Sequence, residues 1–275
     1  MISTLKKQPD GTIELTITIP EDLVKKTWEE VTEDFIKSAS VPGFRKGKAP
    51  KKLLEGKLDK SKIKEEVLKR LLPTAYLEAV KKHNLRPIIN PKIHIGELKE
   101  GADWQFTVFT CETPGVELNS YKQAIQKVTV KGKIVIPGKE PKTANFEDII
   151  KALLESINIV IPKVLKDLQV EKLLAQTLDE IKRLGLSLDQ YLASTGKTPE
   201  SLRDEYEKKA EDDIRLEFAL QKIAEEEKIV VEEKEIEEAI QKAKDENERK
   251  NLESNRYLLA SILRQQKTLD FLKNL

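Results

Sequence analysis

The side chains of this sequence that could do chemistry are few and lie far apart. Its only histidines are His83 and His94, and Cys111 is its single cysteine. An imidazole acts as a general acid or base when a carboxylate or thiol partner is close, and neither histidine has one nearby in the sequence. His83 falls at a polar helix end, His94 on the polar face of a strand and Cys111 at a strand end, which are ordinary structural positions. The sequence therefore predicts no catalytic residue.

Metal and nucleotide sites lack sequence signatures as well. The acid-rich stretches 225–228 and 232–238 do not have the ordered acid and glycine spacing of a calcium loop, so they indicate solvated helix faces. The glycines form neither GxGxxG nor GxxxxGK[ST]. A single cysteine rules out a disulfide framework within the chain and fits a reducing compartment. We expect no cofactor and no metal, and an enzymatic role ranks last.

The stretch SVPGFRKGKAP, residues 40–50, has the composition of a binding loop. Arginine and lysine pair with phosphates or carboxylates, glycines let a backbone approach a partner, and a phenylalanine can fill an apolar slot or stack on a base. The alternative is a helix-joining turn whose phenylalanine packs inward and whose cations are solvated. The candidate binding residues are Gly43, Phe44, Arg45, Lys46, Gly47 and Lys48.

Charge along the chain favours the binding interpretation. Between Lys37 and Arg70, twelve lysines or arginines stand against four acids, a net charge of +8, whereas the whole chain carries only +1. Between Glu200 and Glu248, nineteen acids stand against nine bases, a net charge of −10. A basic region followed by an acidic one predicts nucleic acid as the partner of the first and not of the second.

Strand patterns occur at both ends of the first 115 residues. Residues 12–19, TIELTITI, alternate strictly between apolar and polar, and the Asp10-Gly11 turn before them predicts a hairpin with residues 2–8. Residues 92–98 and 104–110 alternate in the same way and predict a second hairpin.

Two helices are expected between these hairpins. An apolar stripe over residues 21–37 predicts the first. Ser61 is the expected cap of the second, which runs to His83, and Pro73 is expected to kink it or to mark a join. Residues 1–115 should therefore form an α+β domain, a small antiparallel sheet with helices on one face.

The remainder of the chain separates into a connector and a helical domain. Residues 116–144 form the connector, in which 127–138 suggest a short hairpin turning at Lys131-Gly132. Residues 145–275 are helical by period and are expected to form an all-α, elongated domain of several helices, some of them arm-like. Its expected helices include 198–228, 232–247 and 249–264.

The loop from Gly43 to Lys48, followed by Ala49-Pro50 and set between two helices of an α+β domain, resembles the ribosome-docking signature of bacterial trigger factor. The resemblance extends over residues 1 to about 118. It resumes from about 145 to the end, where IVIPKVL, LDQYLASTG, a long charged helix and IVVEEKEIEEAI follow in the order seen in that family's substrate-holding domain.

The resemblance implies a ribosome-associated chaperone that needs no ATP and shelters nascent or unfolded chains. Its partner would be the large ribosomal subunit at the polypeptide exit, where the loop would contact ribosomal RNA and a ribosomal protein. Phe44 and Arg45 would be the anchors, and Lys46 and Lys48 would add electrostatic support. The resemblance leaves open whether the free protein forms a homodimer, and no residue is assigned to client binding.

The chain departs from the family in its middle. Trigger factors usually carry an FKBP-type prolyl isomerase domain between the two matching regions, and that domain needs an aromatic-lined pocket. Only residues 116–144 are available here, with Tyr121 as their single aromatic residue. We therefore predict a form that lacks this domain and has no isomerase activity.

The sequence also bears on where the protein is located and on its alternative functions. The N-terminus shows no apolar run after a basic segment, and no window approaches the length of a membrane span, so a cytoplasmic protein without membrane contact is expected. The main alternative is an RNA-binding protein with an acidic helical protein-interaction module. A periplasmic chaperone with a similar helical pattern is disfavoured by the missing signal sequence and by the basic loop.

Overall fold

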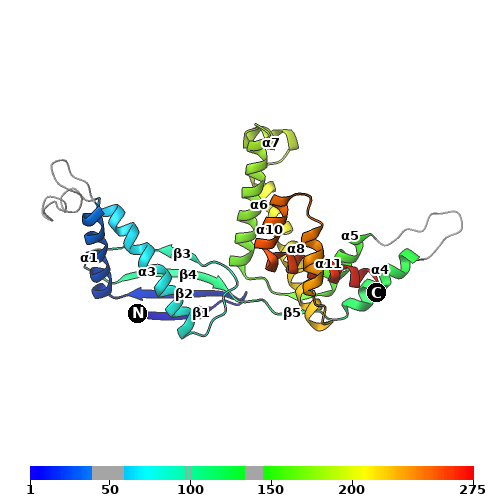
Figure 1. Cartoon of the computed structure of the whole chain (residues 1–275), viewed down its shortest axis with the longest axis horizontal. Helices are drawn as coiled ribbons and strands as arrows, with labels where there is room; N and C mark the ends of the chain where they lie inside the picture. Colours follow the sequence, from blue (N-terminus) through cyan, green and yellow to red (C-terminus); the bar gives the residue numbers. More distant parts are fainter. Residues whose placement is uncertain (39–58, 97, 100, 134–144) are drawn as a thin grey trace. The chain divides into compact units, whose positions relative to one another are not determined.

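A computed structural model describes residues 1–38, 59–96, 98–99, 101–133 and 145–275 (Figure 1). These residues group into two compact units. The first, here called the sheet unit, comprises Met1–Thr113 together with Pro162–Leu165. The second, the helical unit, comprises Pro114–Ile161 and Lys166–Leu275.

The sheet unit is built on a four-stranded antiparallel sheet with the order β1-β2-β4-β3. Both predicted hairpins are present, with Ile2 opposite Thr18 in the first and Ile93 opposite Val108 in the second. Gly11 takes a φ of 87° in the first turn, a conformation that favours glycine. The strands are β1 (Ile2–Lys7), β2 (Thr12–Ile19), β3 (Lys92–Ile95) and β4 (Trp104–Cys111).

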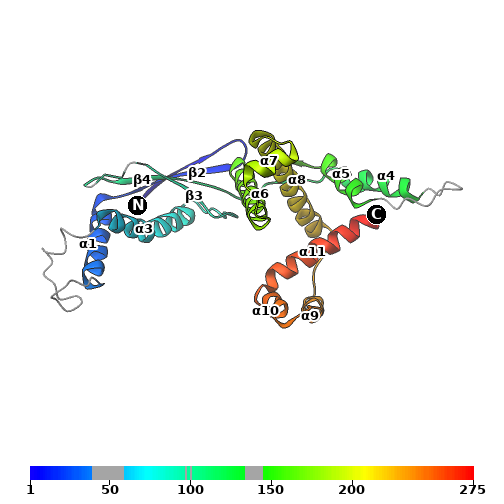
Figure 2. The same ribbon diagram turned by 90° about the horizontal axis from the view of Figure 1, so that it is seen from above.

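Two helices, α1 (Glu21–Ser38) and α3 (Lys60–Lys82), cover one face of this sheet (Figure 2). The alternation predicted for residues 12–19 places the four apolar residues of β2 inward, each no more than 1% exposed. They pack with Val31 of α1 and Val67 of α3, both fully buried. The expected α+β architecture with helices on one face is confirmed.

The start of α3 differs from the expectation. Asp59 caps the helix, because its Oδ1 accepts a hydrogen bond from the backbone N–H of Ser61 at 2.9 Å. The prediction of Ser61 as the cap is therefore wrong by two residues. The helix is also continuous through Pro73, so this proline marks no join. Leu71 and Ala75 on either side are buried in the core, and this packing helps to keep the helix in place where the proline removes one backbone hydrogen bond.

The helical unit confirms the expected multi-helix region, and it adds a two-stranded sheet in which β5 (Val116–Glu117) pairs with β6 (Asn158–Ile159). Its main core joins α4, α5, α8 and α11 through apolar residues such as Ile125, Leu153, Ile223 and Leu272, each fully buried. The helices are α4 (Tyr121–Lys133), α5 (Phe146–Ser156), α6 (Lys163–Arg183), α7 (Leu188–Thr195), α8 (Pro199–Glu226), α9 (Glu233–Gln241), α10 (Glu246–Ser254) and α11 (Arg256–Lys273).

The predicted hairpin at 127–138 is wrong wherever the structure describes it. Residues 127–133 belong to α4, and 134–138 lie outside the described residues. Tyr121 and Ile125 are buried four residues apart, and Thr129 continues the same stripe. Packing of this stripe against the helical core overrides the strand preference of the β-branched residues near 128–130.

Helix boundaries at the C-terminal end also differ from the prediction. The expected helix 198–228 is present as α8, which Thr198 caps through a hydrogen bond from the Ser201 N–H at 3.1 Å. The helix expected over 232–247 ends at Gln241, and a separate helix, α10, starts after Asp245, whose carboxylate accepts from the Glu248 N–H at 2.7 Å. The helix expected over 249–264 is divided between α10 and α11.

Candidate functional site

The predicted binding residues Gly43, Phe44, Arg45, Lys46, Gly47 and Lys48 all lie outside the described residues. What the structure describes is the pair of helices on either side of them in the sequence. Helix α1 ends at Ser38 and α3 begins at Lys60. The two helices pack on each other, and Arg70 of α3 forms an ion pair with Asp34 of α1 at 3.0 Å.

Several described cations of the basic segment already have acidic neighbours. Lys37 lies 3.8 Å from Glu33, and Lys69 lies 2.9 Å from Glu65. The hydrogen bond with Glu65 raises the pKa of Lys69, which keeps its charge engaged locally. In contrast, residues 39–58 contain six lysines or arginines and one acid, a net charge of +5 by sequence. By sequence, +5 of the net charge of +8 between Lys37 and Arg70 therefore falls within residues 39–58.

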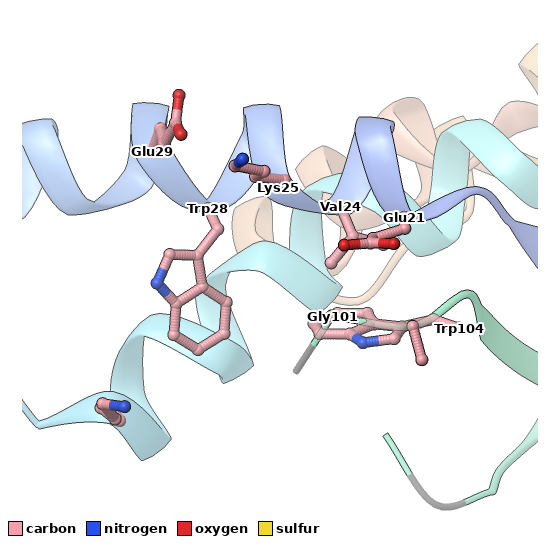
Figure 3. A pocket seen from close by; sticks show the side chains of 9 residues that line it. Glu21, Val24, Lys25, Trp28, Glu29, Gly101 and Trp104 are labelled. Carbon is pink, nitrogen blue, oxygen red and sulfur yellow. The ribbon is translucent and has the colours of Figure 1, made fainter. Parts of the chain in front are cut away.

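A recess in the sheet unit lies between the start of α1, the start of α3 and the turn before β4, with a volume of about 470 Å³ (Figure 3). Trp28 projects from α1 into it, and Trp104 forms its base beneath Val24 and Glu21. The indole N–H of Trp104 donates to the Lys99 carbonyl at 3.1 Å, which fixes the ring. Nothing in the sequence predicted this recess.

His83 lies at the end of α3, His94 lies in β3 and Cys111 ends β4, which are the positions that the sequence predicts. His83 Nε2 lies 3.1 Å from the Ser3 hydroxyl, and His94 contacts Phe109 edge to face with ring centres 5.3 Å apart. Burial raises the pKa of the Cys111 thiol to about 11, so it is not a ready nucleophile. Within the described ranges, no cluster of three or more His, Cys, Asp or Glu side chains could hold a metal ion. No described helix combines the length and apolar composition needed to cross a membrane.

The helical unit leaves apolar side chains open to solvent at the turn between α6 and α7. Leu184 is 73% exposed, and Leu186 and Leu188 are about half as exposed. Gly185 has a φ of 73° and ends α6, which brings three leucines at alternate positions into one short turn. Sequence reasoning missed this cluster, although the spacing of leucines around a glycine was a usable signal.

A cleft of about 600 Å³ lies between α8, residues 229–231 and α11. One side chain at it, that of Tyr257, is 90% exposed. The lining combines well-buried or half-buried apolar side chains, Leu220, Ala224, Val231 and Ala260, with polar ones, Glu217, Gln221, Ser261 and Gln265. Such a lining can accept apolar groups and hydrogen-bonding groups together.

Two cations of α11 hold the backbone of residues 229–231 against this cleft. Arg264 Nε donates to the Ile229 carbonyl at 2.9 Å, and Lys267 Nζ donates to the Val230 carbonyl at 2.8 Å. Lys267 also pairs with Glu235 at 2.9 Å. The backbone N–H of Glu232, followed by Lys267, lowers the pKa of the Glu235 carboxyl, so this group stays ionised at neutral pH.

Comparison with known proteins gives matches along nearly the whole chain. Residues 1–135 match the family model for bacterial trigger factor protein, and residues 138–274 match the model for the trigger factor C-terminus. The trigger factor of Natranaerobius thermophilus is 34% identical over 122 residues, and that of a Streptococcus pneumoniae strain is 35% identical over 120 residues. Each match covers 44% of this chain but only 27% and 28% of the relative, respectively.

The fold has a counterpart among solved structures. One described as "Promiscuous Substrate Recognition in Folding and Assembly Activities of the Trigger Factor Chaperone" aligns with a TM-score of 0.68 at 14% identity. The alignment covers 100% of this chain and 99% of that one, which shows a shared fold from end to end. Together, the two family models and this fold establish that the chain belongs to the bacterial trigger factor family.

Proposed function

We propose that this chain is a ribosome-associated molecular chaperone that works without ATP. It docks on the large ribosomal subunit through residues 43–48 of its N-terminal domain and shelters nascent or unfolded chains with its helical domain. Membership of the trigger factor family supports the proposal, and the solved structure of that fold is itself described as a chaperone with promiscuous substrate recognition.

The observation that carries the client-binding part is the exposed apolar surface of the helical unit. Tyr257 is 90% exposed, Leu184 73% and Val230 64%. Side chains of this size are normally covered in a stable globular protein when they occur in groups, and exposed groups indicate interaction surfaces. Weak contacts with several such groups would hold an unfolded chain without selecting one sequence.

Docking is supported by the charge distribution. By sequence, residues 39–58 carry a net charge of +5, which suits phosphate contacts with ribosomal RNA. Phe44 and Arg45 are the proposed anchors, since an aromatic beside an arginine is typical of an interface hot spot. The acidic helices of the other unit would be repelled by RNA and left available for clients.

We further propose that the chain has no prolyl isomerase activity. The match to the first family model ends at residue 135, and the match to the second begins at residue 138. The chain therefore has no room for an inserted domain between the two matches. Of the residues assigned to the connector, 121–133 are already used by α4.

The experiment is co-sedimentation with purified bacterial ribosomes at physiological salt. The unaltered chain is compared with a Phe44→Ala, Arg45→Ala, Lys46→Ala triple variant. A Lys6→Ala, Lys81→Ala double variant is the matched control. It also removes two positive charges, but from exposed positions elsewhere in the sheet unit.

The proposal expects the unaltered chain and the control to pellet with ribosomes and the triple variant to stay in solution. The rival RNA-binding function uses the same basic region and expects binding to naked ribosomal RNA that depends on charge and not on Phe44, so an Arg45→Ala, Lys46→Ala double variant would weaken it as much as the triple variant does. Equal pelleting of all three proteins, or of none, would contradict the docking role of residues 43–48.

A further inference from the structure

We propose that residues 229–231, on the wall of the cleft between α8 and α11, bind an extended polypeptide by pairing with its backbone. The inference rests on the proposed chaperone function and adds to it a mode of client recognition. A segment of a client would lie beside Ile229-Val230-Val231 as an added strand, in the manner of β-strand addition.

Some backbone N–H and C=O groups of this segment have no hydrogen-bond partner among the described residues. The Ile229 N–H donates to the Ala224 carbonyl at 2.8 Å, and the carbonyls of Ile229 and Val230 accept from Arg264 and Lys267. No residue of the described chain hydrogen-bonds to the N–H of Val230 or to the N–H and carbonyl of Val231. One residue with both groups free is what an antiparallel partner needs to form a hydrogen-bonded pair.

The residue types and their burial fit an edge strand. Isoleucine and valine are the residues that strands prefer, yet residues 229–231 belong to no helix or strand of the protein. Their side chains are half-buried, exposed and half-buried in turn, with Val230 at 64%. This alternation is that of a strand with one covered face. The cations at Arg264 and Lys267 hold the segment in place before any client arrives.

The cleft offers further groups to a bound backbone. Ser261 and Gln265 of α11 and Glu217 of α8 line it and have no hydrogen-bond or ion-pair partner among the described residues. These side chains can bond to backbone N–H and C=O groups that point away from the added strand. A client helix would satisfy its own backbone and gain nothing from the free groups of Val231, so an extended segment is the occupant that fits.

Backbone pairing suits a protein that has to accept many sequences. The peptide groups are the same in every client, whereas the half-buried Val231 and Ala260 in the cleft give a general preference for apolar side chains. The cleft would therefore discriminate little between client sequences.

The test uses a fluorescein-labelled peptide of sequence Lys-Thr-Val-Thr-Val-Thr-Val-Lys and the full-length protein, with binding read by fluorescence anisotropy. Two further peptides carry N-methyl groups on either all three threonines or all three valines. An added strand directs only one of these sets of N–H groups toward the protein. We expect one methylated peptide to lose about tenfold in affinity or more, and the other to bind nearly as the parent does.

A pair of protein variants provides the second arm. Val231→Pro removes the free N–H and also restricts the backbone. Val231→Ala is the control, because it also loses the valine side chain but keeps the N–H. We expect Val231→Pro to lose parent-peptide binding and Val231→Ala to keep most of it. If Val231→Pro fails to fold by circular dichroism, the methylated peptides alone decide.

The inference is overturned if the two methylated peptides bind equally well or equally poorly, or if folded Val231→Pro binds the parent as the unaltered protein does. Ribosome pelleting of the same preparations is scored separately. Loss of pelleting by the unaltered protein counts against the proposed docking, while an equal effect of the two methylation patterns counts only against strand addition.

Discussion

Replacing Tyr121 by phenylalanine should weaken the helical unit without affecting the sheet unit. The Tyr121 hydroxyl at the start of α4 donates to Glu227 Oε1 at 3.0 Å, and the tyrosine side chain is almost fully buried. Glu227 is the C-terminal cap of α8 and also pairs with Lys122 at 2.7 Å. This hydrogen bond therefore joins α4 to the end of α8.

The size of the effect follows from the environment of the bond. A hydrogen bond to a charged acceptor contributes about 1.5–3 kcal/mol to stability. The Glu227 side chain is 22% exposed and keeps its pair with Lys122 in the variant, so we expect the low end, about 1.5 kcal/mol. Tyr257→Phe is the matched control, because that side chain is 90% exposed and its hydroxyl has no hydrogen-bond partner among the described residues.

The assay exploits the distribution of chromophores. Both tryptophans, Trp28 and Trp104, belong to the sheet unit, whereas most helices belong to the helical unit. Urea unfolding is therefore followed by tryptophan fluorescence for the first unit and by far-ultraviolet circular dichroism mainly for the second. Tyr121→Phe should shift the dichroism transition to lower urea and leave the fluorescence transition in place.

The pH dependence supplies a second check. Lys122 first, and then the Tyr121 hydroxyl, hold the pKa of Glu227 below its usual value. A carboxyl with a lowered pKa in the folded state stabilises the fold above its unfolded pKa of about 4.3, and this contribution is lost as the pH falls through the folded value. The difference between the unaltered protein and Tyr121→Phe should thus be complete at neutral pH and shrink on acidification. Identical dichroism curves at neutral pH, or equal shifts of both signals, would refute the reasoning.

Three further outcomes are expected. Leu15→Ala, which empties a fully buried position of β2, should cost about 3 kcal/mol in the fluorescence-detected unfolding of the sheet unit, and a cost below about 1 kcal/mol would contradict the packing described. Cys111, buried and with a pKa raised to about 11 by that burial, should react with a thiol reagent slowly in the folded protein and rapidly in urea; prompt reaction without urea would speak against its burial. Gly196→Ala places a Cβ at a φ of 66° after α7 and should destabilise the helical unit by about 1 kcal/mol, while no change in the dichroism transition would argue against that turn.

Elements with a strong period were predictable from sequence because one physical signal determines them. TIELTITI alternates over eight residues, and it forms β2 over the predicted range with its four apolar residues buried. The long charged segment 198–228 likewise contains α8, since its apolar residues recur at helical spacing and a threonine cap precedes Pro199.

Elements whose local and tertiary preferences conflict were predicted wrongly. Residues 127–133 contain β-branched residues and a glycine, which favour a hairpin locally. Their helical state depends on the burial of Tyr121 and Ile125 against α5 and α8, and the sequence does not reveal those contacts. The cap of α3 was misplaced for a smaller reason, because Asp59 and Ser61 are both good capping residues and only geometry selects one.

The cleft could not be foreseen for a similar reason. Leu220 and Ala224 belong to an apolar stripe of α8 that looks the same in sequence whether it is fully covered or lines a groove. The groove exists because Val230 and Tyr257, 27 positions apart, reach the same place in the fold. Residues 43–48 were predicted to be a binding loop from their residue types, the surrounding positive charge and the family resemblance, and that role stays a prediction.

The most direct test of the account is photo-crosslinking on translating ribosomes. A photoreactive amino acid is placed at position 184 or 257, and Lys250 on α10, a helix without buried residues, serves as the control position. We predict crosslinks to the nascent chain from 184 and 257, few from 250, and loss of the crosslinks when Phe44, Arg45 and Lys46 are changed to alanine. Crosslinks that persist in that triple variant, or that are as frequent from position 250, would contradict a chaperone docked through residues 43–48.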